Sequence, residues 1–235
     1  TPFRLIIVDN NSTDNTEDFL FELKETLKNN PLCKSYDAHF NVENYGIGGG
    51  RNQCLKIANK YNDKYLSTID NDVDFSNNNN WLEDCIDFID ANPKFSIGIN
   101  LEEVNYPIKE FNNKKIAFKD RGNLGTACTV FSRKMHEDIG FFLKFGKYGL
   151  EDSNFFLRSR VAGYQMGYLP TPGIHLGKGN EDVGEYREFK TNEQKKHMQD
   201  FIKECNLYST RKKSIKLPYS CPDEKEPKKT IYEIY

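Results

Sequence analysis

Short apolar runs alternate with amphipathic segments along the first hundred residues. Four runs have the length and the β-branched or aromatic content of strands: Phe3 to Val8, Tyr36 to Val42, Tyr65 to Ile69 and Phe95 to Leu101. Between them, apolar residues recur every three or four positions, which predicts helices around Leu20, Leu55 and Ile86. Strands that alternate with helices predict an α/β fold with a mixed, mostly parallel sheet.

The second half of the chain is less regular. Glu102 to Gly122 is polar and is expected to be an irregular excursion. Four further elements are predicted, strands at Gly125 to Phe131 and Tyr164 to Leu169 and helices at Leu150 to Ala162 and Glu188 to Cys205. We expect one domain over residues 1–208, with halves at 1–100 and 101–208. Residues 209–235 are expected to form an extended tail, although Thr230 to Tyr235 alternates like a strand.

Charge, apolar runs and cysteine spacing argue against several classes of function. The 235 residues carry a net charge of -2, which gives no reason to expect a nucleic-acid partner. The apolar runs are strand-sized, so no membrane span is expected. The six cysteines are scattered without a C-x-x-C pair, which argues against a zinc knuckle and favours a reducing, cytoplasmic location, although their even number leaves disulfides open. The chain begins at Thr1 rather than Met, which leaves open whether an upstream segment has been lost.

Asp70-Asn71-Asp72 is the sharpest chemical feature of the sequence. Two carboxylates at i and i+2 after a strand can converge on one hard cation. Such a cation can neutralise a diphosphate and make it a better leaving group. The alternative is an ordinary turn or helix cap. The other polar cluster, at Asp9, also follows a strand, where α/β sheets bind ligands.

A calcium-binding EF-hand loop is a rival interpretation of the same segment. Counted from Asp72, residues Asp74, Ser76 and Glu83 occupy ligand positions 3, 5 and 12. Asn77 stands where that loop requires glycine, and the preceding segment is predicted to be a strand rather than a helix. The EF-hand therefore ranks second.

Three other segments have a functional and a structural interpretation. The turn Gly46 to Gly50 lacks the third glycine of a dinucleotide fingerprint, so it is either a flexible helix entry or a phosphate contact with Arg51. Glu151 and Asp152 either complement a helix dipole or include a general base. His175, between glycines after a strand, is either an ordinary loop residue or a metal ligand that would favour Mn²⁺ over Mg²⁺.

Together these segments resemble glycosyltransferase family 2, the inverting enzymes with the GT-A-type, Rossmann-like fold. Five motifs carry the resemblance, and they follow one another along the chain in the same order as in the family: Ile6 to Asp14, Asn44 to Asn52, Asp70 to Asp72, Gly149 to Asp152, and His175. They span about residues 3 to 179. Each motif is weak alone, and their order and spacing make the resemblance strong.

The resemblance implies a role for each matching residue. Asp9 and Asn11 would contact the nucleotide, Arg51 would help to hold it, and Asp70 would approach the ribose or the donor sugar. The metal, Mn²⁺ or Mg²⁺, would be bound by two residues, Asp72 and His175. The acceptor would be bound by Glu151, and Asp152 would be the catalytic base. The resemblance thus makes residues 1–100 the nucleotide-binding half and residues 101–208 the acceptor-binding half.

The implied reaction is transfer of a sugar from a nucleoside-diphosphate sugar, expected to be UDP-linked, to a hydroxyl of a glycan, protein or small molecule. The family's first strand and helix, which precede the equivalent of Phe3 to Val8, have no counterpart in the sequence. Two alternatives remain, a nucleotidyltransferase on a related fold and a non-catalytic calcium- or glycan-binding module. A nucleotidyltransferase would need a basic, Gly-rich phosphate loop after its first strand, and donor hydrolysis would distinguish a transferase from a binding module.

Overall fold

A computed structural model describes residues 1–101, 105–125, 127–176 and 184–235. The chain divides into two compact units. The first contains Thr1–Asn62 and Tyr219–Tyr235, and the second contains Asp63–Pro218. The expected nucleotide-binding half, residues 1–100, and acceptor-binding half, residues 101–208, are functional divisions and stay predictions.

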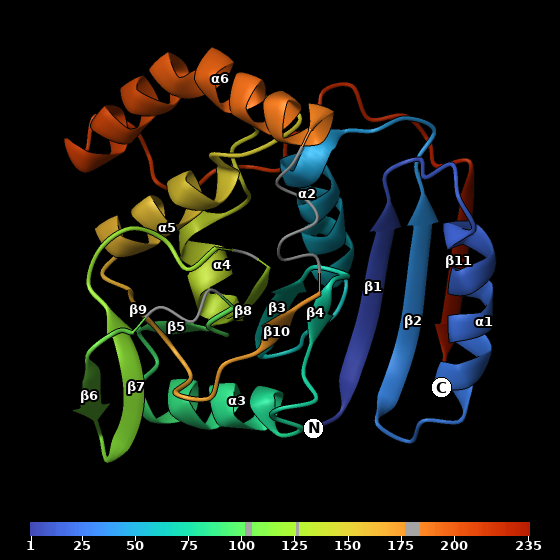
Figure 1. The fold of residues 1–235 in the computed structure, drawn as a ribbon, viewed down its shortest axis with the longest axis horizontal. Coiled ribbons are helices and arrows are strands. Elements are labelled where there is room, and N and C mark those ends of the chain that lie inside the picture. Colours follow the sequence, from blue (N-terminus) through green and yellow to red (C-terminus); the bar gives the residue numbers. More distant parts are fainter. Residues whose placement is uncertain (102–104, 126, 177–183) are drawn as a thin grey trace. The chain divides into compact units, whose positions relative to one another are not determined.

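The first unit is built on a three-stranded sheet in the order β1-β2-β11 (Figure 1). Strand β1 (Phe3–Asp9) pairs in parallel with β2 (Cys33–Phe40), and β11 (Lys229–Ile234) pairs with β2 in the antiparallel direction. Helix α1 (Thr16–Lys28) connects β1 to β2, and helix α2 (Gly46–Ala58) follows β2 and contacts β1. The expected order of strand, helix, strand and helix is confirmed here.

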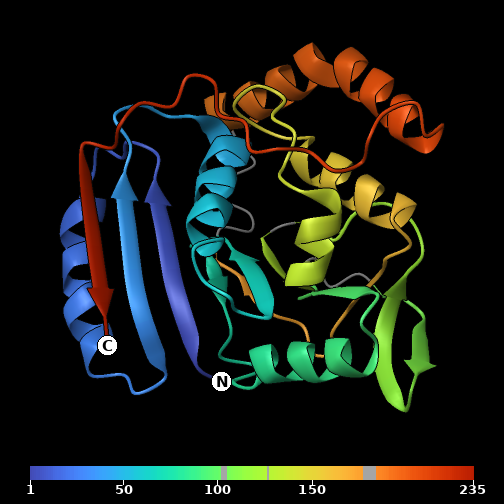
Figure 2. The same ribbon diagram turned by 180° about the vertical axis from the view of Figure 1, so that it is seen from behind.

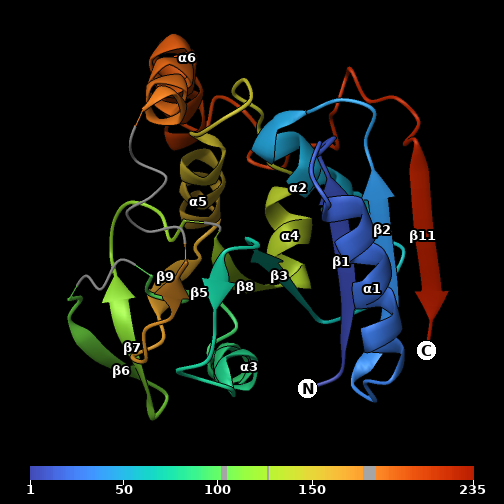
Figure 3. The ribbon, with the colours of Figure 1, turned by 45° about the vertical axis from the view of Figure 1, so that its right-hand side comes forward.

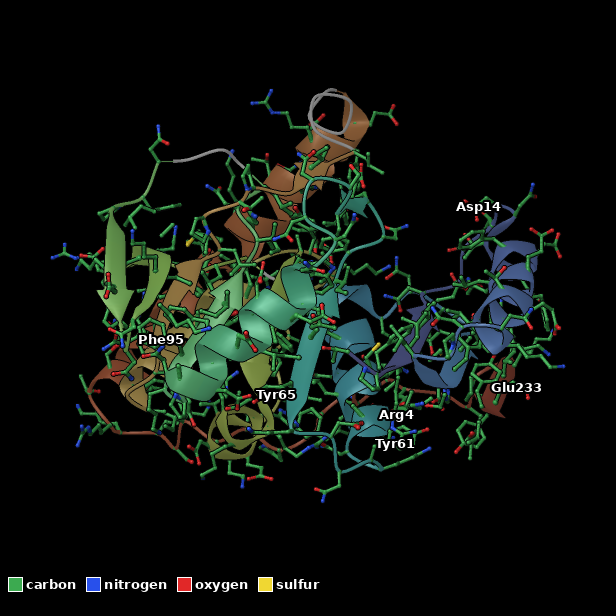
Figure 4. All side chains as sticks on the ribbon, turned by 90° about the horizontal axis from the view of Figure 1, so that it is seen from below. Arg4, Asp14, Tyr61, Tyr65, Phe95 and Glu233 are labelled. Carbon is green, nitrogen blue, oxygen red and sulfur yellow. The ribbon has the colours of Figure 1, made fainter. Side chains whose placement is uncertain are left out.

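The alternation along β2 gives the sheet two chemically different faces. Buried apolar residues share one face with Leu20 and Leu27 of α1: Tyr36, Ala38 and Phe40. Asp37 points to the other face and accepts a 2.9 Å hydrogen bond from the Tyr61 phenol. The Arg4 guanidinium lies 4.5 Å from the centre of the Tyr61 ring, and Figure 4 shows the two side chains beside each other. Burial, with Asp37 adding to it, raises the pKa of Tyr61.

The C-terminal segment is a strand rather than a plain extended tail. Strand β11 runs along the free edge of β2, with Ile231 opposite Ala38 (Figure 2). Ile231 is buried in the core that α1 forms with β2. The strand-like alternation of Thr230 to Tyr235 was therefore the correct signal, because an open strand edge and an apolar core together stabilise the pairing.

The second unit contains a mixed six-stranded sheet in the order β3-β8-β5-β9-β7-β6. Its strands are β3 (Tyr65–Ile69), β5 (Phe95–Gly98), β6 (Ile108–Phe111), β7 (Lys114–Lys119), β8 (Cys128–Ser132) and β9 (Gln165–Tyr168). Strands β5 and β9 are parallel, and the other neighbours are antiparallel. A separate two-stranded ribbon pairs β4 (Val73–Asp74) with β10 (Ile174–His175) in antiparallel register.

The segment expected to be irregular, Glu102 to Gly122, contains the hairpin of β6 and β7. Residues 102–104 lie outside the described residues. The hairpin turns at Asn112 and Asn113, whose φ angles are 47° and 62°. Two consecutive left-handed residues define the turn that matches the twist of a hairpin, and asparagine tolerates this conformation. Asn112-Asn113 was therefore a hairpin signal that the expectation overlooked.

Helices cover both faces of the six-stranded sheet, with α3 (Trp81–Ala91) on one face and α4 (Arg133–Ile139) and α5 (Glu151–Val161) on the other (Figure 3). Helix α4 was not expected, and Ser132 caps it by accepting a 3.2 Å bond from the Met135 backbone N–H. Helix α6 (Glu185–Ser209) packs on α5. Among the described helices, none combines the length and the apolar character that a bilayer crossing requires.

Candidate functional site

The β4–β10 ribbon brings two of the expected metal ligands together. His175 lies opposite Val73, and the Leu176 backbone N–H donates a 2.8 Å bond to the Asp72 carbonyl. This register places His175 Nε2 3.5 Å from Asp72 Oδ2, with each side chain about one-quarter exposed. The short ribbon thus aligns an imidazole and a carboxylate that are distant in the sequence.

The remaining polar atoms of this pair fit a cation. Asp72 Oδ1 and His175 Nδ1 are both buried, and neither has a hydrogen-bond partner. Buried polar atoms are rarely left unpaired, so each such atom calls for an explanation. Oxygen and imidazole nitrogen are donors that suit Mn²⁺. Within the described ranges, no group of three or more metal-ligating side chains is found, so this pair would leave coordination positions for a ligand or water.

The carboxylates that flank Asp72 have different surroundings. Asp70 is half-buried directly after β3, and its backbone N–H donates a 2.7 Å bond to the Ala127 carbonyl. Asp74 accepts bonds of 2.8 Å and 2.9 Å from the backbone and hydroxyl of Ser76, so it is occupied in its own turn. Strand β3 stands where an EF-hand requires its entering helix, and this geometry argues against the calcium-binding loop.

Glu151 and Asp152 begin α5 after an unusual backbone segment. Gly149 and Leu150 have φ angles of 86° and 69°, and Leu150 is the residue before the helix. A bulky residue in left-handed conformation is strained and has to be held there by its surroundings. Glu151 is buried, while Asp152 is half-buried and accepts a 2.5 Å bond from the Ser153 backbone N–H. The first helical turn favours both negative charges.

A buried arginine fixes the helix that carries these two carboxylates. The Arg158 guanidinium is fully buried and donates to the Asn154 side chain at 2.8 Å. It also donates to three backbone carbonyls, those of Ile139, Phe141 and Ile215. Burial lowers the pKa of Arg158 to about 10, which leaves it charged at neutral pH. The sequence did not reveal this role, because an arginine in an amphipathic helix usually faces solvent.

The first unit carries the residues expected to bind the nucleotide. Asp9 is buried at the end of β1, where its two carboxylate oxygens each accept a 3.2 Å bond from the Ser12 backbone N–H. Asn11 has a φ of 67°, which asparagine tolerates. Its side-chain oxygen accepts a 3.1 Å bond from Lys228 Nζ. Lys228 was not among the expected site residues, because only the pairing of β11 with β2 brings it to this end of the sheet.

A network of side-chain amides ties the loop after β1 to helix α2. Asn41 donates to Asn10 at 3.1 Å and to Gln53 at 2.8 Å. The expected glycine turn is part of α2 itself, since the helix begins at Gly46. A Cβ on Gly50 would lie 3.1 Å from the Asn10 amide nitrogen, so glycine allows this close approach.

The expected site residues belong to both units of the chain. Asp72 and His175 are brought together directly, and Glu151 and Asp152 belong to the same unit. The first unit holds the nucleotide-binding candidates, Asp9, Asn11 and Arg51, the last of which is half-buried in α2. Gly177, which flanks His175 in the expected motif, lies outside the described residues. Their roles in binding and catalysis stay predictions.

Comparison with known proteins supplies the family and the fold. The profile of Glycosyl transferase family 2 matches residues 1–162. No curated protein sequence matches the chain. Solved structures give 33 matching chains, among them the mannosyltransferase PcManGT from Pyrobaculum calidifontis in complex with GDP-Man and Mn²⁺. Its sequence identity is 16% and its TM-score 0.61, and the match covers 86% of the present chain and 54% of that one, so the chain spans about half of its length.

Proposed function

Because the chain belongs to Glycosyl transferase family 2, we propose that it transfers a sugar from a nucleoside-diphosphate sugar to an acceptor hydroxyl, with inversion at the anomeric carbon. The observation that carries the proposal is the Asp72–His175 pair, with its 3.5 Å separation and one buried, unpartnered polar atom on each residue. The family match covers both the Asp70 to Asp72 segment and the Glu151–Asp152 pair.

In this proposal Asp72 and His175 would hold Mn²⁺ or Mg²⁺. A divalent cation bound there would neutralise the leaving diphosphate. The approach of His175 Nε2 to Asp72 Oδ2 supports this assignment, because it brings one imidazole nitrogen and one carboxylate oxygen close enough to share a cation. The mannosyltransferase PcManGT was solved with Mn²⁺, which supports the same choice of metal.

Asp152 would act as general base in a single displacement. Its carboxylate accepts the proton of the acceptor hydroxyl while the acceptor oxygen bonds to the anomeric carbon. The bond from that carbon to the diphosphate oxygen breaks at the same time, which inverts the configuration. Glu151 would bind the acceptor. The left-handed Leu150 and the buried Arg158 support this role, because both fix the start and the path of α5.

On the nucleotide side, Asp9, Asn11 and Arg51 would contact the base and ribose, and Asp70 would approach the ribose or donor sugar. Lys228 adds a cation beside Asn11, where it would favour an anionic ligand. We expect a UDP-linked donor. The corresponding ligand of PcManGT is GDP-Man, so donors of both nucleotides belong in the test.

The test is a panel of UDP- and GDP-sugars, screened by thermal shift and by slow donor hydrolysis with and without Mn²⁺. The proposal expects one donor class to raise the melting temperature in a Mn²⁺-dependent manner and to be hydrolysed. If no donor is bound or hydrolysed, and Ca²⁺ alone raises the melting temperature, the chain is a binding module instead.

A further inference from the structure

Two aromatic rings are exposed at the start of α6. Tyr186 and Phe189 are 50% and 40% exposed. Their ring centres lie 6.3 Å apart with an angle of 15° between the planes, so the rings are stacked and present flat apolar surface. A stacked pair of rings offers a flat apolar face that suits a small ligand with an apolar face of its own.

This pair continues into the segment that precedes the proposed base. Lys190 Nζ lies 4.4 Å from the centre of the Tyr186 ring and 5.1 Å from that of Tyr148. Tyr148 stands three residues before Glu151. Burial raises the pKa of the Tyr148 phenol, and the Lys190 ammonium acts in the opposite direction, in agreement with the contact between these two side chains. One cation thus links the exposed rings to the start of α5.

The close packing of α6 on the 146–149 segment makes this arrangement specific. A Cβ on Gly149 would lie 2.8 Å from the Gln194 side chain. The Lys147 backbone N–H donates a 3.1 Å bond to Glu193. The segment before Glu151 therefore packs directly against α6, which fixes the position of this helix relative to the start of α5.

We propose that Tyr148, Tyr186, Phe189 and Lys190 form an acceptor-binding surface for a saccharide. This rests on the proposed function, and it names the acceptor class. A pyranose ring has an apolar C–H face that fits a flat aromatic ring, and hydroxyls at its edge that require polar partners. The surface offers both, because ammonium, phenol and carboxylate groups border the rings.

Other occupants fit this surface less well. Two rings of this exposure present roughly 200 Å² or less, far below the roughly 800 Å² that a stable protein interface buries on each partner. Membrane surfaces attract clusters of about four to eight basic residues. The helix start instead has balanced charges, with Glu185 and Glu188 beside Arg187 and Lys190.

The test separates saccharide binding from catalysis. Saturation-transfer NMR is recorded with a panel of methyl glycosides and short oligosaccharides, without donor, on the wild-type chain and on the double variant Tyr186→Ala/Phe189→Ala. We expect strong transfer to the C–H protons of one sugar face, and about tenfold weaker binding in the double variant. A separate Lys190→Met variant should weaken binding as well.

The matched control is Met198→Ala/Ile202→Ala. These two side chains are 36% and 44% exposed on the same helix, and Met198 lies nine residues from Phe189, about 180° around the axis. This control should bind saccharides as the wild type does. The melting temperature of each variant shows whether it is folded, and single Tyr186→Ala and Phe189→Ala variants replace the double one if it is not.

Three results would overturn the proposal: no saccharide of the panel binds, the ring variants bind as tightly as the wild type, or the control loses binding equally. Vesicle binding or self-association that only the ring variants lose would assign the surface to a membrane or to a second copy. Absence of donor hydrolysis would count against the transferase alone, because the NMR experiment contains no donor.

Discussion

His175 Nε2 lies 3.5 Å from Asp72 Oδ2 because a two-residue ribbon aligns them. The pairing of Ile174 with Asp74 and of His175 with Val73 fixes this register. A strand slipped by one residue would turn the imidazole to the opposite face. The relationship between the two residues is therefore set by backbone pairing.

Asp72→Asn is expected to abolish the Mn²⁺-dependent part of donor binding, because the amide lacks the negative charge that holds a divalent cation. A donor at about 100 times its Kd stabilises the protein by roughly 2.7 kcal/mol in total, which is the upper limit of this loss. Thermal shift with donor, with and without Mn²⁺, measures the loss, and His175→Ala should act in the same direction.

The control for this change is Asp74→Asn. The Asp74 carboxylate is occupied by Ser76 within its own turn, so its loss should leave the response to Mn²⁺ intact. An equal loss of response in both variants would show that the effect comes from the charge of the loop rather than from a ligand at Asp72.

Asp152→Asn should spare donor binding and stop transfer, because the amide cannot accept the proton of the acceptor hydroxyl. General-base catalysis typically contributes about 10²- to 10⁴-fold, so kcat for transfer should fall by that factor. Product formation and donor binding are measured on the same preparation. Unchanged turnover would remove Asp152 from the mechanism.

Gly140→Ala should destabilise the protein strongly. Gly140 has a φ of 69°, and a Cβ there would lie 1.9 Å from the Leu217 carbonyl oxygen, which belongs to the backbone. We expect a loss of about 2–4 kcal/mol in the free energy of unfolding from strain and overlap together. Denaturant unfolding measures the difference.

Gly163→Ala separates the two causes. Gly163 has a φ of 85°, but no atom lies within 4 Å of its virtual Cβ, so only the backbone strain of about 1 kcal/mol is expected. If the two substitutions cost the same, the contact with Leu217 does not contribute to stability.

Acid should destabilise the second unit through His136. Burial lowers the pKa of His136 below its ordinary value of 6.5. The unfolded chain therefore binds a proton at a higher pH than the folded one does. The stability that this histidine contributes is complete above pH 6.5 and is lost as the pH falls below it, by up to about 1.4 kcal/mol per pH unit.

His136→Gln removes this titration. The free energy of unfolding should then fall less between pH 7.5 and pH 5.5 than it does in the wild type. Burial also lowers the pKa of His39 in the first unit, so part of the acid sensitivity should persist in the variant. Identical pH profiles for the wild type and the variant would contradict the prediction.

The sequence by itself determined the elements whose signals are local. The apolar run of β3 and the Gly163 that ends α5 have residue types that favour one conformation, whatever surrounds them. The same holds for the order of the motifs, which identified the family. The hairpin at Asn112 and Asn113 was also encoded locally, although its signal was overlooked.

Only the tertiary structure decided which distant residues meet. The ribbon that joins His175 to Asp72, the strand that brings Lys228 to Asn11, and the burial of Arg158 all depend on long-range pairing. Such contacts form because open strand edges pair with segments that are distant in the sequence, and apolar faces pack against them. Local residue preferences carry no information about which distant segments these are.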